Sequence, residues 1–129
     1  MRVRVLWAAA TLGLIGCETQ GVVCTQEFRS AILVVRDSTG QLLSGATITT
    51  RLLRTGEILP LPLTGSLSYP GIYVILTDGA KDQLQPGGDS IGVTVSPLLG
   101  SDTLVRFLFD VPGGCHIRKV AGPDTLDLR

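Results

Sequence analysis

The sequence predicts an all-β protein whose folded part is a single antiparallel β-sandwich of about seven short strands. Short runs of β-branched and aliphatic residues recur about every ten residues, a spacing typical of sandwiches. The 129-residue chain contains 16 glycines and 7 prolines, many of which fall between these runs where turns are needed. No window of a dozen residues shows sustained helical periodicity, so helical folds are disfavoured.

The apolar runs differ in how they alternate, and this predicts their places in the sandwich. The run at 31–37 is apolar on both alternations, which predicts a central strand covered on both faces. The run at 45–53 alternates and predicts one buried face, whereas the two prolines in 58–63 restrict that segment to an edge or a loop. Further strands are expected at 69–78, 90–96, 103–110 and 115–120, and a short last strand at 124–128.

The N-terminus has the layout of a secretory signal. Arg2 and Arg4 precede an uncharged apolar run of 12 residues, 5–16, which is shorter than the roughly 20 residues that span a bilayer as a helix. The end of the run, Leu14-Ile15-Gly16-Cys17, resembles the lipobox of bacterial lipoproteins. This resemblance implies cleavage before Cys17 and lipidation of its sulfur. The alternative is an ordinary signal or a buried N-terminus with an incidental cysteine, although Leu14 fits a lipobox better than an ordinary cleavage site.

These features divide the chain into a signal peptide at 1–16, a lipidated tether at 17–29 and a sandwich domain at 30–129. The resemblance implies a bacterial envelope protein held at the membrane by lipid on Cys17. More than one acyl chain is needed for stable anchoring, and lipobox processing supplies them. Glu18 stands where an aspartate would retain an enterobacterial lipoprotein at the inner membrane, so we expect the outer membrane.

Charge and cysteine count restrict the function further. Without residues 1–16, 113 residues remain, and their 9 basic and 11 acidic side chains give a net charge near −2 with no basic patch. Nucleic-acid binding therefore has no electrostatic basis. If Cys17 is lipidated, Cys24 and Cys115 are the two thiols left in an oxidising compartment, and we expect them to form a disulfide.

Three segments carry a resemblance to carboxypeptidase regulatory-like domains. They are "VVRDSTGQLLSGATITTR" (34–51), "YPGIYVI" (69–75) and "GGCHIRKV" (113–120). The resemblance implies a transthyretin-like or immunoglobulin-like sandwich in a small bacterial lipoprotein. It is structural and implies no peptidase activity, because such domains lack the zinc ligands of the catalytic domain they accompany. The segment "TDGAKDQ" (77–83) departs from the family's usual lysine-proline-glycine-aromatic turn.

The sequence offers little for catalysis or metal binding. His116 is the single histidine, and on a strand its ring would point away from the neighbouring Cys115 thiol, so we interpret it as a surface or packing residue. A single histidine gives a hydrolase triad no support, and Cys24, Cys115 and His116 lack the paired spacing of a zinc site. We therefore expect no catalytic residue, no metal and no cofactor.

Two groups of residues are candidates for binding. Asp78, Asp82 and Asp89 share one glycine-rich loop and could offer oxygens to Ca²⁺, but their spacing does not match an EF-hand, and such aspartates commonly cap turns. We keep this loop as a candidate ligand surface. Tyr69 and Tyr73 could form a carbohydrate platform or could be packing groups.

The sequence thus predicts a lipid-anchored envelope protein that acts by binding or scaffolding, with an envelope protein or a glycan as its partner. The alternative is an accessory carbohydrate- or peptide-binding module that serves an envelope enzyme or transporter. An enzyme in its own right ranks third.

Overall fold

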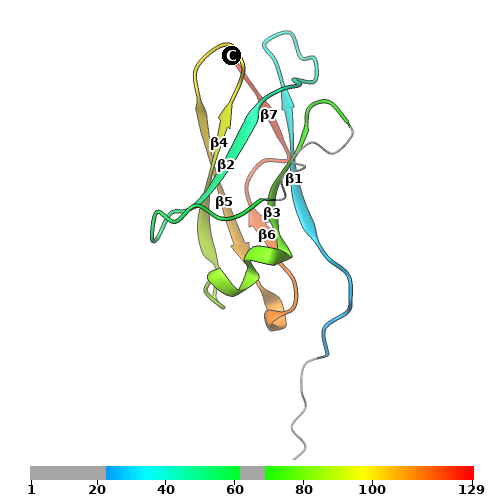
Figure 1. The fold of residues 1–129 in the computed structure, drawn as a ribbon, viewed down its shortest axis with the longest axis vertical. Coiled ribbons are helices and arrows are strands. Elements are labelled where there is room, and N and C mark those ends of the chain that lie inside the picture. Colours follow the sequence, from blue (N-terminus) through cyan, green and yellow to red (C-terminus); the bar gives the residue numbers. More distant parts are fainter. Residues whose placement is uncertain (1–22, 62–68) are drawn as a thin grey trace, which may run out of the picture.

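The computed structural model describes residues 23–61 and 69–129, which form two packed β-sheets (Figure 1). One sheet has three strands in the order β3-β1-β7, and the other has four in the order β2-β4-β5-β6. The predicted all-β sandwich is therefore confirmed. Its elements are β1 (Ser30–Arg36), β2 (Thr47–Leu52), β3 (Ile72–Thr77), the 3₁₀ helix η1 (Asp78–Gln83), β4 (Asp89–Ser96), β5 (Thr103–Asp110), the 3₁₀ turn η2 (Pro112–Gly114), β6 (Arg118–Ala121) and β7 (Thr125–Asp127).

The core lies between the two sheets and is built from alternate residues of the strands. Successive side chains of a strand point to opposite faces, so every second residue can face the other sheet. The fully buried aliphatic and aromatic side chains include Leu33 and Val35 of β1, Ile91, Val93 and Val95 of β4, and Phe109 of β5.

Burial on both faces occurs in β3 and not in β1, where the sequence predicted it. β1 alternates, with Leu33 and Val35 buried but Ile32 43% exposed, whereas five of the six residues of β3 are buried. On the outer face of β3, Val74 lies opposite the exposed Ile32 and is only 6% exposed. On the inner face, Tyr73 lies opposite Leu33, and its hydroxyl donates to the Leu43 carbonyl (2.7 Å) and accepts from the Ala46 amide (3.1 Å). The apolar runs of β1 and β3 therefore do not reveal which of the two strands is buried on both faces.

One strand pair departs from the predicted antiparallel arrangement. β7 runs parallel to β1, with Val34 opposite Thr125 and Arg36 opposite Asp127. Three residues, 122–124, separate β6 from β7, and over them the chain passes from the four-stranded sheet to the three-stranded one. The direction of β7 is therefore set by this crossing and not by a hairpin.

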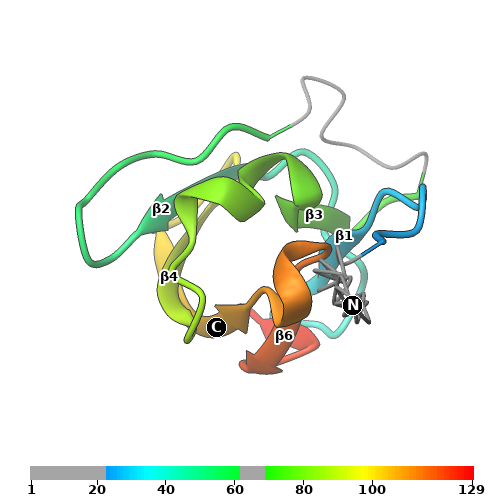
Figure 2. The ribbon, with the colours of Figure 1, turned by 90° about the horizontal axis from the view of Figure 1, so that it is seen from below.

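The two lateral corners of the sandwich differ. At the β2–β3 corner, the buried Thr50 hydroxyl donates to the Ile75 carbonyl across the sheets (2.5 Å), and η1 leads the chain from β3 toward β4 (Figure 2). At the β1–β6 corner, β7 pairs only with the second half of β1. The edge of the first half of β1 is left without a strand partner among the described residues.

Residues around 58 and 115 also differ in detail from regular strands. Arg51 and Ile58 form an isolated bridge and Leu59 is buried, as expected for an edge or loop, while residues 62 and 63 lie outside the described residues. The strand expected at 115–120 begins only at Arg118, because Gly113 and Gly114 adopt positive φ (66° and 73°) and turn the chain.

In the described part of the chain, no helix has the length and apolar character to cross a membrane.

Candidate functional site

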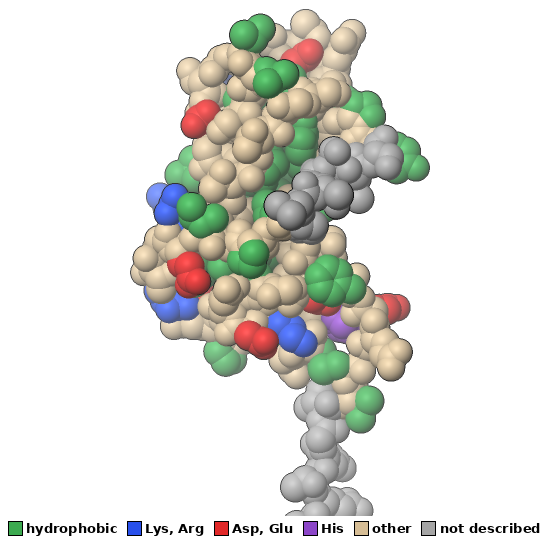
Figure 3. Space-filling model, viewed as in Figure 1, with side chains coloured by type: hydrophobic (Ala, Val, Ile, Leu, Met, Phe, Trp, Pro, Cys, Tyr) green, Lys and Arg blue, Asp and Glu red, His purple; other side chains and the backbone are tan. Residues whose placement is uncertain are grey.

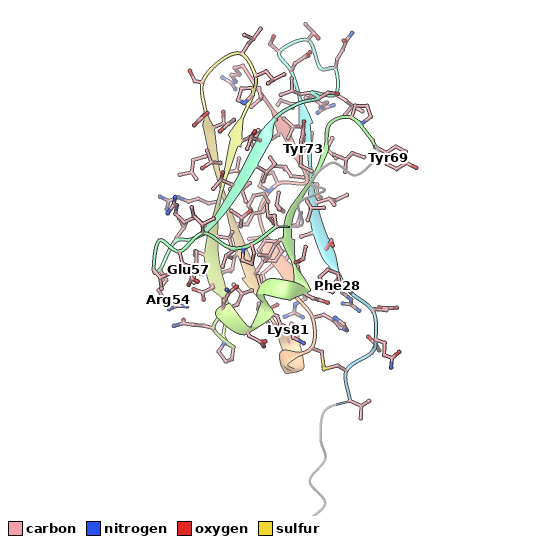
Figure 4. The ribbon with its side chains drawn as sticks, in the orientation of Figure 1. Phe28, Arg54, Glu57, Tyr69, Tyr73 and Lys81 are labelled. Carbon is pink, nitrogen blue, oxygen red and sulfur yellow. A yellow bond between two sulfur atoms is a disulfide. The ribbon has the colours of Figure 1, made fainter. Side chains whose placement is uncertain are left out.

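The N-terminal segment joins one end of the sandwich through five side chains that we call the base cluster: Cys24, Thr25, Asp78, Cys115 and His116. Cys24 and Cys115 form the predicted disulfide, with Cα atoms 5.2 Å apart. Figure 4 shows this bond linking the N-terminal segment to the turn after η2. The bridge joins residues 91 positions apart, and in Figure 1 the C-terminus lies at the opposite end of the molecule.

Asp78 is the centre of the base cluster. It begins η1, whose N-cap residue Thr77 accepts a hydrogen bond from the Gly79 amide. Its carboxylate accepts from two backbone amides, those of Arg29 (2.8 Å) and Ile117 (2.8 Å). The buried carboxylate therefore fastens the start of β1 and the turn before β6 to the end of β3.

His116 extends this network to the N-terminal segment. Its Nδ1 lies 2.6 Å from Asp78 Oδ2, and its Nε2 lies 2.8 Å from Thr25 Oγ1. The imidazole is mostly buried, with 12% of its side chain exposed. Of the two interpretations from the sequence, a surface or a packing residue, the burial agrees with packing, and the turn at 115–117 also gives the ring a polar partner, Asp78, which the sequence did not reveal.

The sequence carried one unused signal for this contact. Thr25 directly follows Cys24, and His116 directly follows Cys115. Once the two cysteines are expected to pair, the residues after them are brought into the same neighbourhood. Nothing in the sequence spacing pointed to Asp78, which is 38 positions from His116.

The hydrogen bonds of the base cluster control the charge of Asp78. Burial by itself would raise the pKa of this carboxyl group, because desolvation disfavours the charged form. The hydrogen bonds from His116 and from the Arg29 and Ile117 amides outweigh burial, and the pKa of Asp78 lies below its usual range. Asp78 is therefore a carboxylate at neutral pH, which suits its role as an acceptor.

The other two loop aspartates have different surroundings. Asp89 is buried and pairs with Arg54 (Nη2 to Oδ2, 3.0 Å), and it also accepts from the Gln85 amide (2.9 Å). Burial tends to raise the pKa of Asp89, but the hydrogen bonds from Arg54 and Gln85 hold it below the usual value. Asp82 is exposed. Two of the three carboxylates of the candidate ligand loop thus have internal partners.

The structure does not bring these aspartates together as a metal site. Within residues 23–61 and 69–129, no three His, Cys, Asp or Glu side chains are placed to hold a metal ion. Tyr73 is buried and Tyr69 is 68% exposed, and Figure 4 shows them pointing to different sides of the chain. The two tyrosines therefore do not form one aromatic platform.

On the face seen in Figure 3, charged groups of both signs are interspersed.

We expect acid to destabilise the protein through Asp78 and Asp89. Because their folded pKa values lie below the unfolded value of about 3.9, their stabilisation is complete above that pH and is lost as the pH falls through the folded pKa values. The free energy of unfolding, measured by denaturant titration from about pH 5 down to pH 2, should fall. Asp78→Asn should flatten this decline, and an unchanged slope in that variant would contradict the assignment.

Comparison with family models, with curated proteins and with solved structures finds no match to this chain. The carboxypeptidase regulatory-like resemblance thus stays a prediction from the sequence motifs.

Proposed function

We propose that this protein is a lipid-anchored component of the bacterial envelope whose sandwich is a non-catalytic binding or scaffolding domain. The observation that carries the proposal is the base cluster, which fastens the sandwich to the segment that follows the predicted lipidation site. Cys17 itself lies outside the described residues. The motifs of carboxypeptidase regulatory-like domains support the same assignment, since such sandwiches serve as accessory domains.

The base cluster suits a domain held by its N-terminus. Cys24 is seven positions after Cys17, so at about 3.5 Å per residue the bridge lies within roughly 25 Å of a lipid on Cys17. A pull on the lipid reaches the disulfide first and is then shared between the turn before β6, through Cys115, and the start of β1, through Arg29 and Asp78. Both sheets thus resist the pull.

Cys17→Ser is expected to release the protein from the membrane. Serine lacks the thiol that accepts the diacylglycerol group, so the two or more acyl chains that give stable anchoring are absent. We would measure detergent-phase partitioning and the intact mass of the protein. Cys24→Ser is a control that should keep the lipid mass, and unchanged mass and partitioning in Cys17→Ser would refute the anchor.

The alternative is an accessory carbohydrate- or peptide-binding module that serves an envelope enzyme or transporter. The separation of Tyr69 from the buried Tyr73 disfavours the aromatic platform by which a sugar would be bound. Peptide binding is therefore the better supported form of this alternative, because it needs only exposed strand edges or loops.

A second candidate function comes from the order of groups in the base cluster. In a hydrolase triad a carboxylate contacts Nδ1 of the histidine and the nucleophilic hydroxyl contacts Nε2. In the base cluster Asp78 and Thr25 occupy these two places, so Thr25 would be the nucleophile. Acyl transfer would also require oxyanion donors, and the amides of Arg29 and Ile117 are already bonded to Asp78. We therefore favour a structural role for the network.

We expect no turnover that depends on His116. The measurement is hydrolysis of p-nitrophenyl acetate by the wild-type protein and by His116→Gln, with Asp82→Ala as the matched surface control. Equal rates in all three support the non-catalytic assignment. A wild-type rate tenfold or more above that of His116→Gln, with Asp82→Ala as fast as wild type, would make Thr25 a nucleophile and overturn it.

A further inference from the structure

We propose that the free edge of β1 at Ser30–Ile32 binds an extended segment of a partner polypeptide as an added strand, with an apolar side chain of that segment in the groove between β1 and β6. This inference rests on the proposed binding function and names the kind of partner. It places the contact beside the base cluster, on the side of the sandwich that β7 leaves open.

The open edge follows from the pairing of β1. β7 pairs with β1 only at Val34–Arg36, and the Val34 amide donates to the Asp124 carbonyl (3.0 Å). Backbone groups alternate between the two edges of a strand, so the N–H and C=O groups of Ser30 and Ile32 share the edge used by Val34. β7 begins too late in the chain to pair with them.

A bulge in the β1–β3 ladder does not disturb this alternation. Between Ala31 and Ile32, β1 advances by one residue, while its partner β3 advances by two, from Leu76 to Val74. The extra residue therefore belongs to β3, and β1 keeps its two-residue period through the bulge. Ser30 and Ile32 thus present two donors and two acceptors in one row, without a strand partner among the described residues.

A groove of about 450 Å³ lies directly beside this edge. Phe109 and Ile117, both buried, form part of its lining, and Ala31 is the smallest inward-facing residue of β1. An added strand would point alternate side chains into the groove and out to solvent. The groove therefore suits an aliphatic residue on the inward face of the segment.

The charged residues around the groove favour an acidic segment. Arg29, Lys119 and Asp124 line it, so its walls carry one net positive charge, although the chain beyond residue 16 is net negative. Lys119 pairs with Asp124, while the Arg29 side chain is 56% exposed and its ion pair with Glu27 is long (3.7 Å). Arg29 is thus the group most available to a carboxylate of the partner.

The edge is also held in place before any partner arrives. The Arg29 amide is bonded to Asp78, and Arg29 immediately precedes Ser30. Leu33, at the other end, is fully buried in the core. Binding to a preorganised edge loses less conformational entropy than binding to a mobile one.

The test uses the full-length protein, purified from membranes in detergent and labelled with ¹⁵N. The probe is the capped peptide acetyl-Glu-Val-Thr-Val-Glu-amide, whose two ends carry carboxylates so that either strand direction is served. We expect saturable shifts of the Ser30, Ile32 and Lys119 amide signals. The same peptide methylated on its three central amide nitrogens should bind at least fivefold more weakly, because it cannot pair with the edge.

Two variants separate the edge from the side chain. Ser30→Pro removes the N–H that faces the partner, and proline is tolerated at the first residue of a strand. Ser30→Ala keeps that N–H. We expect at least a fivefold loss of affinity in Ser30→Pro and no loss in Ser30→Ala, with signals away from the edge unchanged in both. The methylated peptide provides the same comparison without any change to the protein.

Several results would overturn the inference. The first is binding of the methylated peptide as tight as that of the unmethylated one, and the second is a set of signal shifts that map away from Ser30 and Ile32. The third is a shift of these two amide signals with protein concentration alone, which would assign the edge to a second copy of the chain. The membrane partitioning of Cys17→Ser is an independent measurement, and none of these results predicts its outcome. Failure of the edge and failure of the proposed anchor are therefore distinguishable.

Discussion

Asp78→Ala is expected to lower the free energy of unfolding by about 3 to 5 kcal/mol, because it removes the shared partner of three hydrogen bonds at once. Alanine would leave the amides of Arg29 and Ile117 without an acceptor, and Nδ1 of His116 would lose its partner. A buried group that loses its hydrogen bond costs about 1 to 3 kcal/mol, and of these three contacts that of Ile117 is buried and those of Arg29 and His116 are partly buried. The loss is large because one carboxylate serves segments before β1 and before β6.

The measurement is denaturant unfolding of Asp78→Ala, Asp78→Asn and Asp82→Ala. Asparagine keeps one carbonyl oxygen and should lose roughly half as much as alanine, because it can still accept from a backbone amide. Asp82 is exposed, and Asp82→Ala should stay within about 0.5 kcal/mol of wild type. If Asp78→Ala destabilised the protein no more than Asp82→Ala does, the central role of Asp78 would be refuted.

The parts of the fold that depend on local pattern could be predicted from the sequence. β4 and β5 were expected at 90–96 and 103–110 and lie at Asp89–Ser96 and Thr103–Asp110. Both contain β-branched or aromatic residues whose buried members alternate, and glycine, proline and aspartate residues stand between them. Local alternation and turn residues are enough to place such strands.

The parts that depend on distant segments could not be predicted in the same way. The burial of β3 on both faces depends on segments distant in the sequence, and the parallel pairing of β7 depends on a crossing between the sheets. β1 and β3 look alike in the sequence, because each is an apolar run on both alternations. Only the neighbours that each strand meets after folding decide which face is covered.

The contacts of the base cluster also differ in whether the sequence could predict them. The Cys24–Cys115 pair could be inferred by counting thiols, because covalent pairing leaves few alternatives. The contact of His116 with Asp78 could not, since Asp78 looked like one of three loop aspartates. What distinguishes Asp78 is the pair of backbone amides that converge on it, and amides carry no sequence signature.

Replacing both Cys24 and Cys115 with alanine is expected to lower the free energy of unfolding by about 2 to 5 kcal/mol. The bridge closes a loop of 91 residues, for which chain-entropy models give about 4 to 5 kcal/mol, and removing both cysteines avoids leaving a free thiol. Wild-type protein unfolded under reducing conditions should match the double variant. Equal stability of oxidised wild-type protein and the double variant would contradict the prediction.

The disulfide should also determine how much Thr25 contributes. Thr25 is exposed and follows Cys24, so the bridge holds its hydroxyl within reach of His116 Nε2 (2.8 Å). Without the bridge, ordering that segment for a single hydrogen bond costs about 1 to 2 kcal/mol per residue, more than the roughly 0.5 to 1.5 kcal/mol that the bond contributes. We therefore expect Thr25→Ala to destabilise the bridged protein by about 1 kcal/mol and the unbridged protein not at all. A double-mutant cycle measures this coupling. Equal effects of Thr25→Ala in both backgrounds would mean that the segment is held by contacts other than the bridge.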